Sequence, residues 1–345
     1  MTLKNDRFLR ACRRQTVDRT PVWFMRQAGR YQPEYRRIRA KYSLMEICEH
    51  PEVCAEVTLL PVRQLGVDAA ILFSDIMTPL RGMGLKVDIV ENVGPVFAEP
   101  IEREEQVAAL PPFAAEEAVP YVLETIRILH RELDVPLIGF AGAPFTLASY
   151  MVEGRPTRDY RKVKTFMYSE PRAWGQLMDR LAEMVASYLV AQVEAGCQVV
   201  QIFDSWVGNL TRTDYETHVR PHMYPIVEAV RAAGAPVIHF GVNTGHLLAS
   251  MADLRPDVMG IDWRTDLDEA WRQIGPGFAV QGNLDPVAVF APPEVLEAKV
   301  TDVLRRAGRR PGHIFNLGHG VMPQMSVSAL QRVVDLVHAY EVREV

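Results

Sequence analysis

Short apolar runs along the chain alternate with longer stretches in which apolar residues recur at the spacing of a helix face. The apolar runs are rich in β-branched and aromatic residues, which favour strands. Strands are predicted at residues 22–27, 69–75, 136–141, 198–204, 236–242, 258–262, 278–282 and 313–316. The helices predicted after them span residues 51–65, 116–133, 172–195, 213–233, 246–254, 267–273, 293–306 and 326–340. The pattern therefore consists of eight strand-helix units.

This alternation predicts an α/β fold with a parallel sheet, because continuously apolar strands need helices over both of their faces. Eight units are the number that closes a (β/α)8 barrel, the TIM barrel. An open doubly wound sheet would show the same alternation and remains the alternative. The chain has 345 residues, more than the roughly 250 typical of that barrel. The glycines and valines of residues 81–99 predict a hairpin insertion after the second strand.

No low-complexity linker, charge block or sequence repeat divides the chain, so residues 1–345 are predicted to form a single domain. In a barrel the C-terminal ends of all strands meet at one rim, where active sites of this fold lie. Predicted strands end in polar residues or glycines at 26–27, 74–75, 204–205, 262–263 and 316–320. The pattern therefore predicts one polar mouth.

Charge and composition narrow the choice of partners. The chain is 48% hydrophobic and 23% charged, with a formal net charge of -5. This argues against a nucleic-acid or anionic-membrane surface, because such surfaces need a broad positive field. No apolar run approaches the roughly 20 residues that span a bilayer, and the start of the chain lacks the apolar core of a signal peptide. We expect a cytoplasmic protein that acts on a small molecule.

Residues 21–31 carry the most specific signal. An apolar run ends in Arg26 and Arg30, with Gly29 just before the second arginine. Each guanidinium can donate two parallel charge-assisted hydrogen bonds, which suits a carboxylate or phosphate, and glycine lets the backbone approach a ligand closely. On composition alone, these residues would be a strand followed by a solvated basic helix. The pattern indicates local capture of an anion.

These residues also carry a family resemblance. The run Arg26-Gln27-Ala28-Gly29-Arg30-Tyr31 resembles the amino-terminal signature of uroporphyrinogen decarboxylases, which trim the acetate side chains of a cyclic tetrapyrrole. Later runs that begin at Tyr150, Phe203, Gln281 and Asn316 are similar to further motifs of that family and occur in the same order. Arg155, Thr157 and Arg158 depart from the second glycine and Ser-Lys pair that the family commonly has. The motifs cover nearly the whole chain, and their concurrence carries the resemblance.

The resemblance implies a reaction and a site. The implied reaction converts the four acetates of uroporphyrinogen III to methyl groups and yields coproporphyrinogen III and CO2, without cofactor or metal, in porphyrin biosynthesis for heme and chlorophyll. It also implies a homodimer. The implied catalytic residues are Asp75 and Arg26. The implied substrate-binding residues are Arg26, Gln27, Ala28, Gly29, Arg30, Asp75, Tyr150, Ser205 and His319.

Asp75 directly follows a predicted strand, where an Asp is often a turn or helix cap. The resemblance implies that its carboxylate instead accepts hydrogen bonds from pyrrole N–H groups. A pyrrole protonated at an α-carbon draws electrons from the bond that breaks as CO2 leaves, and a nearby carboxylate stabilises that positive charge. The resemblance implies an arginine of the Arg26/Arg30 pair as a candidate proton donor, although a guanidinium pKa above about 12 suits proton transfer poorly. His319, between two glycines, is expected to titrate near neutrality and to donate to a substrate carboxylate.

Two other functions remain open on sequence alone. A zinc methyltransferase on a similar barrel would need a His-x-Cys pair and a later Cys, but residues 239–241 read His-Phe-Gly and no Cys follows Cys197. His218 and His222 have helical spacing, but Pro221 lies between them and no carboxylate completes a ligand set, so no metal site is predicted. A non-catalytic tetrapyrrole carrier is the second alternative. Asp75 argues against it, because a carrier needs no charge under the ring nitrogens.

Overall fold

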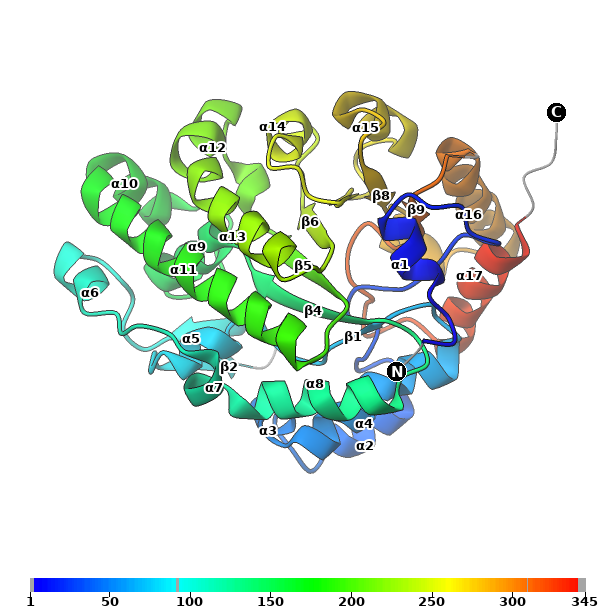
Figure 1. Cartoon of the computed structure of the whole chain (residues 1–345), viewed down its shortest axis with the longest axis horizontal. Coiled ribbons are helices and arrows are strands. Elements are labelled where there is room, and N and C mark those ends of the chain that lie inside the picture. The colour runs from blue at the N-terminus through cyan, green and yellow to red at the C-terminus, as the bar shows by residue number, and fades with distance from the viewer. Residues whose placement is uncertain (1–2, 91–92, 309, 341–345) are drawn as a thin grey trace.

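The computed structural model describes residues 3–90, 93–308 and 310–340. Within these residues, seven parallel strands form a curved sheet in the order β1-β4-β5-β6-β7-β8-β9, surrounded by helices (Figure 1). These strands are β1 (Ala70–Ile71), β4 (Leu137–Gly142), β5 (Val199–Asp204), β6 (Val237–Gly241), β7 (Val258–Gly260), β8 (Ala279–Gln281) and β9 (His313–Ile314). An antiparallel pair, β2 (Val87–Val90) and β3 (Gly94–Phe97), lies between β1 and β4 in the chain.

The helices fall into two groups. Those at the helix spans predicted from the pattern, one for each strand-helix unit, are α4 (Pro51–Leu65), α8 (Pro120–Glu132), α11 (Pro171–Ala195), α13 (Arg220–Ala232), α14 (Leu248–Ala252), α15 (Leu267–Ile274), α16 (Pro293–Ala307) and α17 (Val327–Ala339). Shorter pieces are α1 (Arg7–Cys12), α2 (Pro33–Arg39), α3 (Leu44–Glu49), α5 (Thr78–Gly82), α6 (Glu104–Ala108), α7 (Ala115–Ala118), α9 (Pro144–Glu153), α10 (Arg161–Ser169), α12 (Arg212–His218), η1 (Val207–Asn209) and η2 (Pro286–Phe290).

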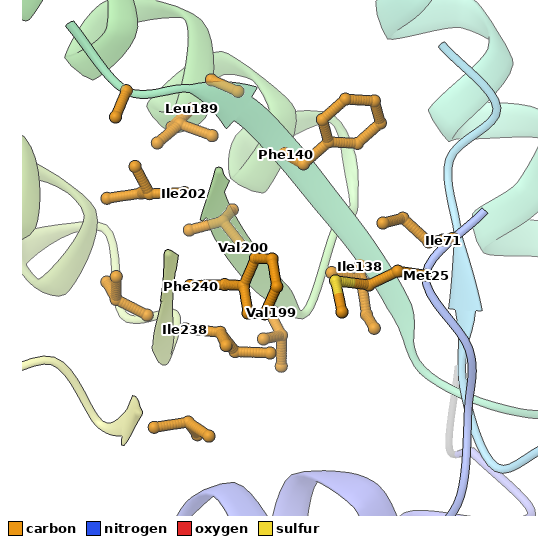
Figure 2. Packing of buried hydrophobic residues seen from close by; sticks show 14 of the residues in the cluster. Met25, Ile71, Ile138, Phe140, Leu189, Val199, Val200, Ile202, Ile238 and Phe240 are labelled. Atoms are coloured by element: carbon orange, nitrogen blue, oxygen red, sulfur yellow. The ribbon is translucent and has the colours of Figure 1, made fainter. Parts of the chain in front are cut away.

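Proline and glycine set the bounds of the longest helix, α11. Pro171 occupies its first turn, where the missing N–H costs no hydrogen bond, and Gly196 follows its last residue. Leu177, Leu181 and Leu189 are buried at helical spacing, and the helix packs against β4 and β5. Leu189 appears with the buried residues of these strands in Figure 2. The predicted helix over residues 172–195 is therefore confirmed.

Two predicted helices are interrupted in the structure. The predicted helix over residues 116–133 is divided into α7 and α8, because Pro120 begins a new helix. The predicted helix over 213–233 is divided into α12 and α13 at Val219, just before Pro221. The β2-β3 pair lies inside the segment where a hairpin is predicted, and residues 91–92 of that segment lie outside the described residues.

The predicted first strand, residues 22–27, differs most from the structure. Only Val22 forms a bridge, parallel to Phe315 just after β9. On its other side, the Val22 carbonyl accepts the N–H of Asp68 at 2.8 Å, and its own N–H donates to the Asp68 carboxylate at 2.9 Å. Arg26 then has a φ of 58°, a left-handed conformation that ends extended backbone. The segment bonds to residues at both edges of the sheet without itself being a regular strand.

Side chains from distant strands meet on the concave side of the sheet. The Trp23 indole donates to Gln281 at 2.9 Å, and Gln281 donates to Gln201 at 3.0 Å, although β8 and β5 are not neighbours in the sheet. Two residues beyond Gln201, the Phe203 ring meets Phe140 and Phe240 edge to face, at centroid distances of 5.4 and 6.2 Å. Phe140, Phe203 and Phe240 therefore form an aromatic floor near the C-terminal ends of the strands.

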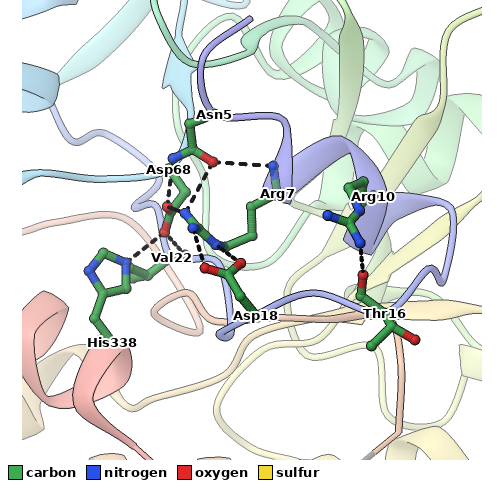
Figure 3. A network of polar contacts seen from close by, with 8 residues as sticks. All are labelled: Asn5, Arg7, Arg10, Thr16, Asp18, Val22, Asp68 and His338. Carbon is green, nitrogen blue, oxygen red and sulfur yellow. Dashed lines mark hydrogen bonds and ion pairs between the residues drawn. The ribbon is translucent and has the colours of Figure 1, made fainter.

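Asp68 ties together the opposite, N-terminal end of the sheet (Figure 3). Its buried carboxylate accepts hydrogen bonds from Asn5, Arg7, the Val22 N–H and His338, at 2.7 to 2.9 Å. Burial raises the pKa of Asp68, but the bonds from His338, Asn5 and Val22 outweigh it and leave the pKa below its usual 3.8. This network joins the start of the chain, the Val22 segment and α17.

Candidate active site

Asp75 lies just beyond β1, at the C-terminal end of the sheet strands, and is half-buried. Its Oδ1 accepts the Met77 N–H at 2.8 Å, so it does act as the cap of the following turn. Burial raises the pKa of the carboxyl above its usual 3.8, while the Met77 N–H and the charge of Arg26 oppose that rise. Within the described residues, no hydrogen bond engages Oδ2. Asp75 thus has a cationic neighbour and one free oxygen.

Tyr150 lies on α9 and joins the same group. Its half-buried ring stacks on Trp206, with centroids 3.9 Å apart and planes at 35°. Burial raises the pKa of the phenol, the Asp75 charge raises it further, and Arg26 lowers it. The hydroxyl therefore keeps its proton at neutral pH and lies in the field of both Asp75 and Arg26. Ser205 precedes Trp206 at the end of β5 and is half-buried at the same rim.

Two glycines place His319 between Arg26 and Trp263. A Cβ on Gly320 would lie 2.6 Å from Arg26 Cδ, and a Cβ on Gly318 would lie 2.3 Å from the Trp263 nitrogen. The Gly318 contact is with backbone, so that position needs glycine, whereas a Cβ at Gly320 would displace the Arg26 side chain. The His319 ring meets the Trp263 ring at a centroid distance of 6.1 Å. The Gly-His-Gly motif therefore packs His319 into a row of side chains along the rim.

His319 is neutral at physiological pH, so the prediction that it titrates near neutrality is wrong. Burial lowers the pKa of the imidazole, and the charges of Arg26 and Arg264 lower it further, to about 4. The Gly320 N–H donates to Nδ1 at 2.7 Å, which leaves the proton of the neutral ring on Nε2. His319 can therefore donate one hydrogen bond from Nε2 without carrying a charge.

The five-residue run from Arg26 to Arg30 divides between the site and the fold. Arg26 is exposed and its charge acts on Asp75, Tyr150 and His319. Gln27 is fully buried: its side chain bonds the Phe24 N–H and the Ala69 carbonyl, and its backbone bonds Phe24 and Tyr31. Each polar atom of Gln27 is thus engaged within the protein. Its contact with the substrate stays a prediction.

The rest of that run lies beside the mouth. Ala28 packs against a small core that contains Tyr35 and Cys54. The Gly29 N–H donates to the Gln32 side chain at 3.1 Å, and a Cβ on Gly29 would meet only ordinary contacts. Arg30 is exposed, and its charge lowers the pKa of Tyr35, which burial raises. Arg26 is therefore the member of this run with the closest electrostatic relation to Asp75.

Sequence reasoning missed the aromatic partners and one further cation at the rim. The Trp206 ring stacks on Tyr150, and the Trp263 ring meets both His319 and Arg264, whose guanidinium carbon lies 3.8 Å from the Trp263 ring centroid. Their positions in the chain could have indicated them as site residues, since Trp206 and Arg264 each come within a few residues of a predicted strand end.

Metal-binding groups do not gather in the described part of the chain. Residues 3–90, 93–308 and 310–340 contain no cluster of three or more His, Cys, Asp or Glu side chains that suits a metal ion. His218 ends α12 whereas His222 lies in α13 and bonds Asp179 at 2.7 Å, so the apparent helical pair is divided between two helices. In the same residues, no helix combines the length and apolar character needed to cross a membrane.

The arrangement suits a particular kind of ligand. One half-buried carboxylate with a free oxygen accepts N–H groups or faces a developing positive charge. Arg26, neutral His319 and protonated Tyr150 are donors to anionic groups near it. Of the three phenylalanines of the floor, Phe203 is half-buried, whereas Phe140 and Phe240 are buried. The site can therefore receive a ligand that combines N–H groups or a developing positive charge with anionic groups.

Comparisons with known proteins agree on one family. Residues 3–340 match the family model described as Uroporphyrinogen decarboxylase (URO-D). A uroporphyrinogen decarboxylase from Sorangium cellulosum is 54% identical over 337 residues, with 97% of this chain and 96% of that protein covered. One from Thermus thermophilus is 55% identical over 337 residues, with 98% of both covered. Among solved structures, a methyltransferase from Methanosarcina mazei has a TM-score of 0.79 at 21% identity and 98% coverage of both chains, a likeness of fold alone.

Proposed function

The chain belongs to the uroporphyrinogen decarboxylase family, and we propose that it decarboxylates the four acetate side chains of uroporphyrinogen III. The products are coproporphyrinogen III and CO2, as a step of porphyrin biosynthesis. The observation that carries the proposal is the group formed by Asp75, Arg26 and Tyr150 at the C-terminal end of the strands. It supplies an anion for the ring and donors for its carboxylates at one place.

Asp75 has the central role in this proposal. Its free Oδ2 accepts hydrogen bonds from pyrrole N–H groups, while the Met77 N–H holds Oδ1 and fixes the carboxylate. When a pyrrole α-carbon takes up a proton, the ring becomes cationic, and the electron pair of the breaking carbon-carboxylate bond flows into it as CO2 leaves. A second proton converts the resulting methylene carbon to methyl, and the ring proton is released. The Asp75 charge stabilises the cationic ring more than the neutral one, which lowers the barrier.

The substrate carboxylates are held by donors around Asp75. Arg26 offers a charged fork, Tyr150 and Ser205 offer hydroxyls, and His319 offers its Nε2–H. Backbone contacts from the run between Ala28 and Arg30 belong to the same proposal. A neutral His319 can donate a hydrogen bond to a substrate carboxylate. Because it carries no charge, it does not repel the cationic ring that Asp75 stabilises. We assign Arg26 to binding first and to proton delivery only through a substrate carboxyl or water.

The proposal also includes the closed barrel and the other properties predicted from the sequence. The hydrogen bonds from the Val22 segment to Phe315 and Asp68 favour a closed (β/α)8 barrel, with β2-β3 as the inserted hairpin. A single domain, a homodimer, a cytoplasmic location and the absence of any cofactor requirement are part of the proposal, on the basis of the family resemblance. Closure of the barrel would place all the named side chains around one mouth.

An anaerobic incubation of the purified protein with uroporphyrinogen III and no added cofactor tests the proposal. Products are oxidised and their carboxyl groups are counted by chromatography. We expect loss of four carboxyls per molecule through intermediates with seven, six and five. A substrate that remains octacarboxylic but binds tightly would favour a non-catalytic carrier. Activity that appears only after zinc or another cofactor is added would contradict the cofactor-independent mechanism.

A further inference from the structure

Arg264 extends the row of side chains on which His319 lies. Gly320 packs on Arg26, Gly318 packs on Trp263, and the Trp263 ring carries the Arg264 guanidinium at 3.8 Å. The His319 ring meets Trp263, on which Arg264 stacks, and the charges of both Arg26 and Arg264 act on the imidazole. An anion that accepts the Nε2–H of His319 would enter the field of both guanidiniums.

Two further contacts hold Arg264 in place. Its Nη1 donates to Asp262 Oδ2 at 2.6 Å, and the same oxygen accepts the Asn243 N–H at 2.8 Å. Asp262 is buried and its carbonyl accepts the Asn283 amide at 2.9 Å, so the ion-pair partner is itself fixed. A guanidinium held by a stack and an ion pair loses little conformational entropy when it binds a further anion.

The rest of the guanidinium is available to a ligand. The Arg264 side chain is 43% exposed, and within the described residues hydrogen bonds engage only its Nη1. It borders an open hollow of about 410 Å³ whose other walls include Asp266 and Glu269. Those acidic groups repel an anion on the side of the hollow. Because the Trp263 ring covers one face of the guanidinium and Asp262 holds Nη1, a carboxylate is received by the edge that carries Nε and Nη2.

We propose that Arg264 binds a peripheral carboxylate of the substrate. This inference rests on the proposed function for the identity of the substrate, because a molecule with many carboxylates can engage His319 and both arginines together. Arg264 is then a binding and specificity residue of the reaction, and its loss affects binding more than the chemical step.

Three variants test this role. Arg264→Gln removes the charge and retains an N–H for Asp262, whereas Arg264→Lys retains the charge without the planar fork. Arg272→Gln is the matched control, since Arg272 lies on the adjoining helix α15, is 70% exposed and pairs only at 3.9 Å with Asp268. Each variant is titrated with oxidised, unreactive uroporphyrin by fluorescence and assayed for turnover of uroporphyrinogen. Thermal unfolding of each variant shows whether the fold is retained.

We expect Arg264→Gln to raise both the Kd and the KM about tenfold, the effect of one charge-assisted hydrogen bond, with kcat nearly unchanged. Arg264→Lys should recover most of the affinity, and Arg272→Gln should behave as wild type. The same loss with coproporphyrin would assign the contact to a propionate, whereas a loss confined to uroporphyrin would assign it to an acetate.

Wild-type affinity in Arg264→Gln, or equal losses in the Gln and Lys variants, would overturn the inference. If wild type binds uroporphyrin but releases no CO2, the proposed function fails while the titrations still decide the role of Arg264; if wild type binds neither compound, both proposals fail.

Discussion

Replacing Asp75 by Asn removes one charge and leaves the local hydrogen bond in place. The Asn side-chain oxygen can still accept the Met77 N–H, which Asp75 Oδ1 accepts at 2.8 Å. The substitution therefore separates the electrostatic role of Asp75 from its role as a turn cap. Removal of a fixed group that faces developing charge typically lowers kcat by about 10²- to 10³-fold. We expect a loss of that size in Asp75→Asn, and a much smaller one in Asp75→Glu, which retains the charge.

Stability should move in the opposite direction to activity. Burial raises the pKa of Asp75 above its usual 3.8, so the folded protein binds this proton more tightly than the unfolded chain does. The ionised carboxylate therefore costs folding free energy at neutral pH; that cost fades as the pH falls through the folded pKa and is gone below the unfolded value of 3.8. Asp75→Asn should be at least as stable as wild type at pH 7, and the difference should vanish in acid. Asp75→Ala, which lacks the acceptor for Met77, should lose about 1 kcal/mol.

The assay for these variants combines anaerobic turnover of uroporphyrinogen with urea unfolding at several pH values. Asp75→Asn with kcat within about fivefold of wild type, well below the effect of a preorganised charge, would refute the electrostatic role. Equal turnover in Asp75→Ala and Asp75→Glu would do the same. A large loss of stability in Asp75→Asn would show instead that the inactive variant is misfolded.

Substitutions at three further positions extend the test. Arg26→Ala should raise the KM about tenfold by loss of a charged donor, and an unchanged KM would count against a binding role. His319→Gln, which keeps a neutral N–H donor, should retain more affinity for the substrate than His319→Ala. Because the pKa of His319 is about 4, the KM of the wild type should show no histidine titration between about pH 6 and 8. A change of KM in that range that is absent from both variants would contradict donation by a neutral imidazole. Asp68→Ala should destabilise the fold by about 3 kcal/mol in urea unfolding at pH 7, because it leaves buried partners unpaired. Since the pKa of Asp68 is lowered, its contribution in wild type should be lost as the pH falls below 3.8, and an acid-independent difference would contradict this.

The pattern of the chain predicts most elements because burial on both faces of a strand requires continuous apolar runs. Helices α4 and α11 match their predicted spans closely. The first predicted strand does not, because the Val22 N–H pairs with the Asp68 side chain, a partner 46 residues away that no local pattern reveals. The interruptions of the predicted helices at Pro120 and Val219 could have been predicted from the sequence, since both lie at or near prolines.

The site divides in the same way. Arg26, Asp75, Tyr150 and His319 could be selected from motifs, and the structure places the charge of Arg26 near the other three. The protonation of His319 could not be predicted, because it depends on burial and on Arg264, which lies 55 positions away by sequence number. For Gln27 the motif suggests a ligand contact, but the structure shows its side-chain amide bonded to Phe24 and Ala69. A motif alone does not reveal such internal hydrogen bonds.

A structure of the protein with coproporphyrinogen bound under anaerobic conditions would show directly what Asp75 contacts. We expect the macrocycle at the C-terminal end of the strands, over the aromatic floor, with an oxygen of Asp75 within hydrogen-bonding distance of pyrrole N–H groups. Its propionates should lie toward Arg26 and His319. A macrocycle bound elsewhere, or bound here with Asp75 facing away from its nitrogens, would contradict the central role given to Asp75.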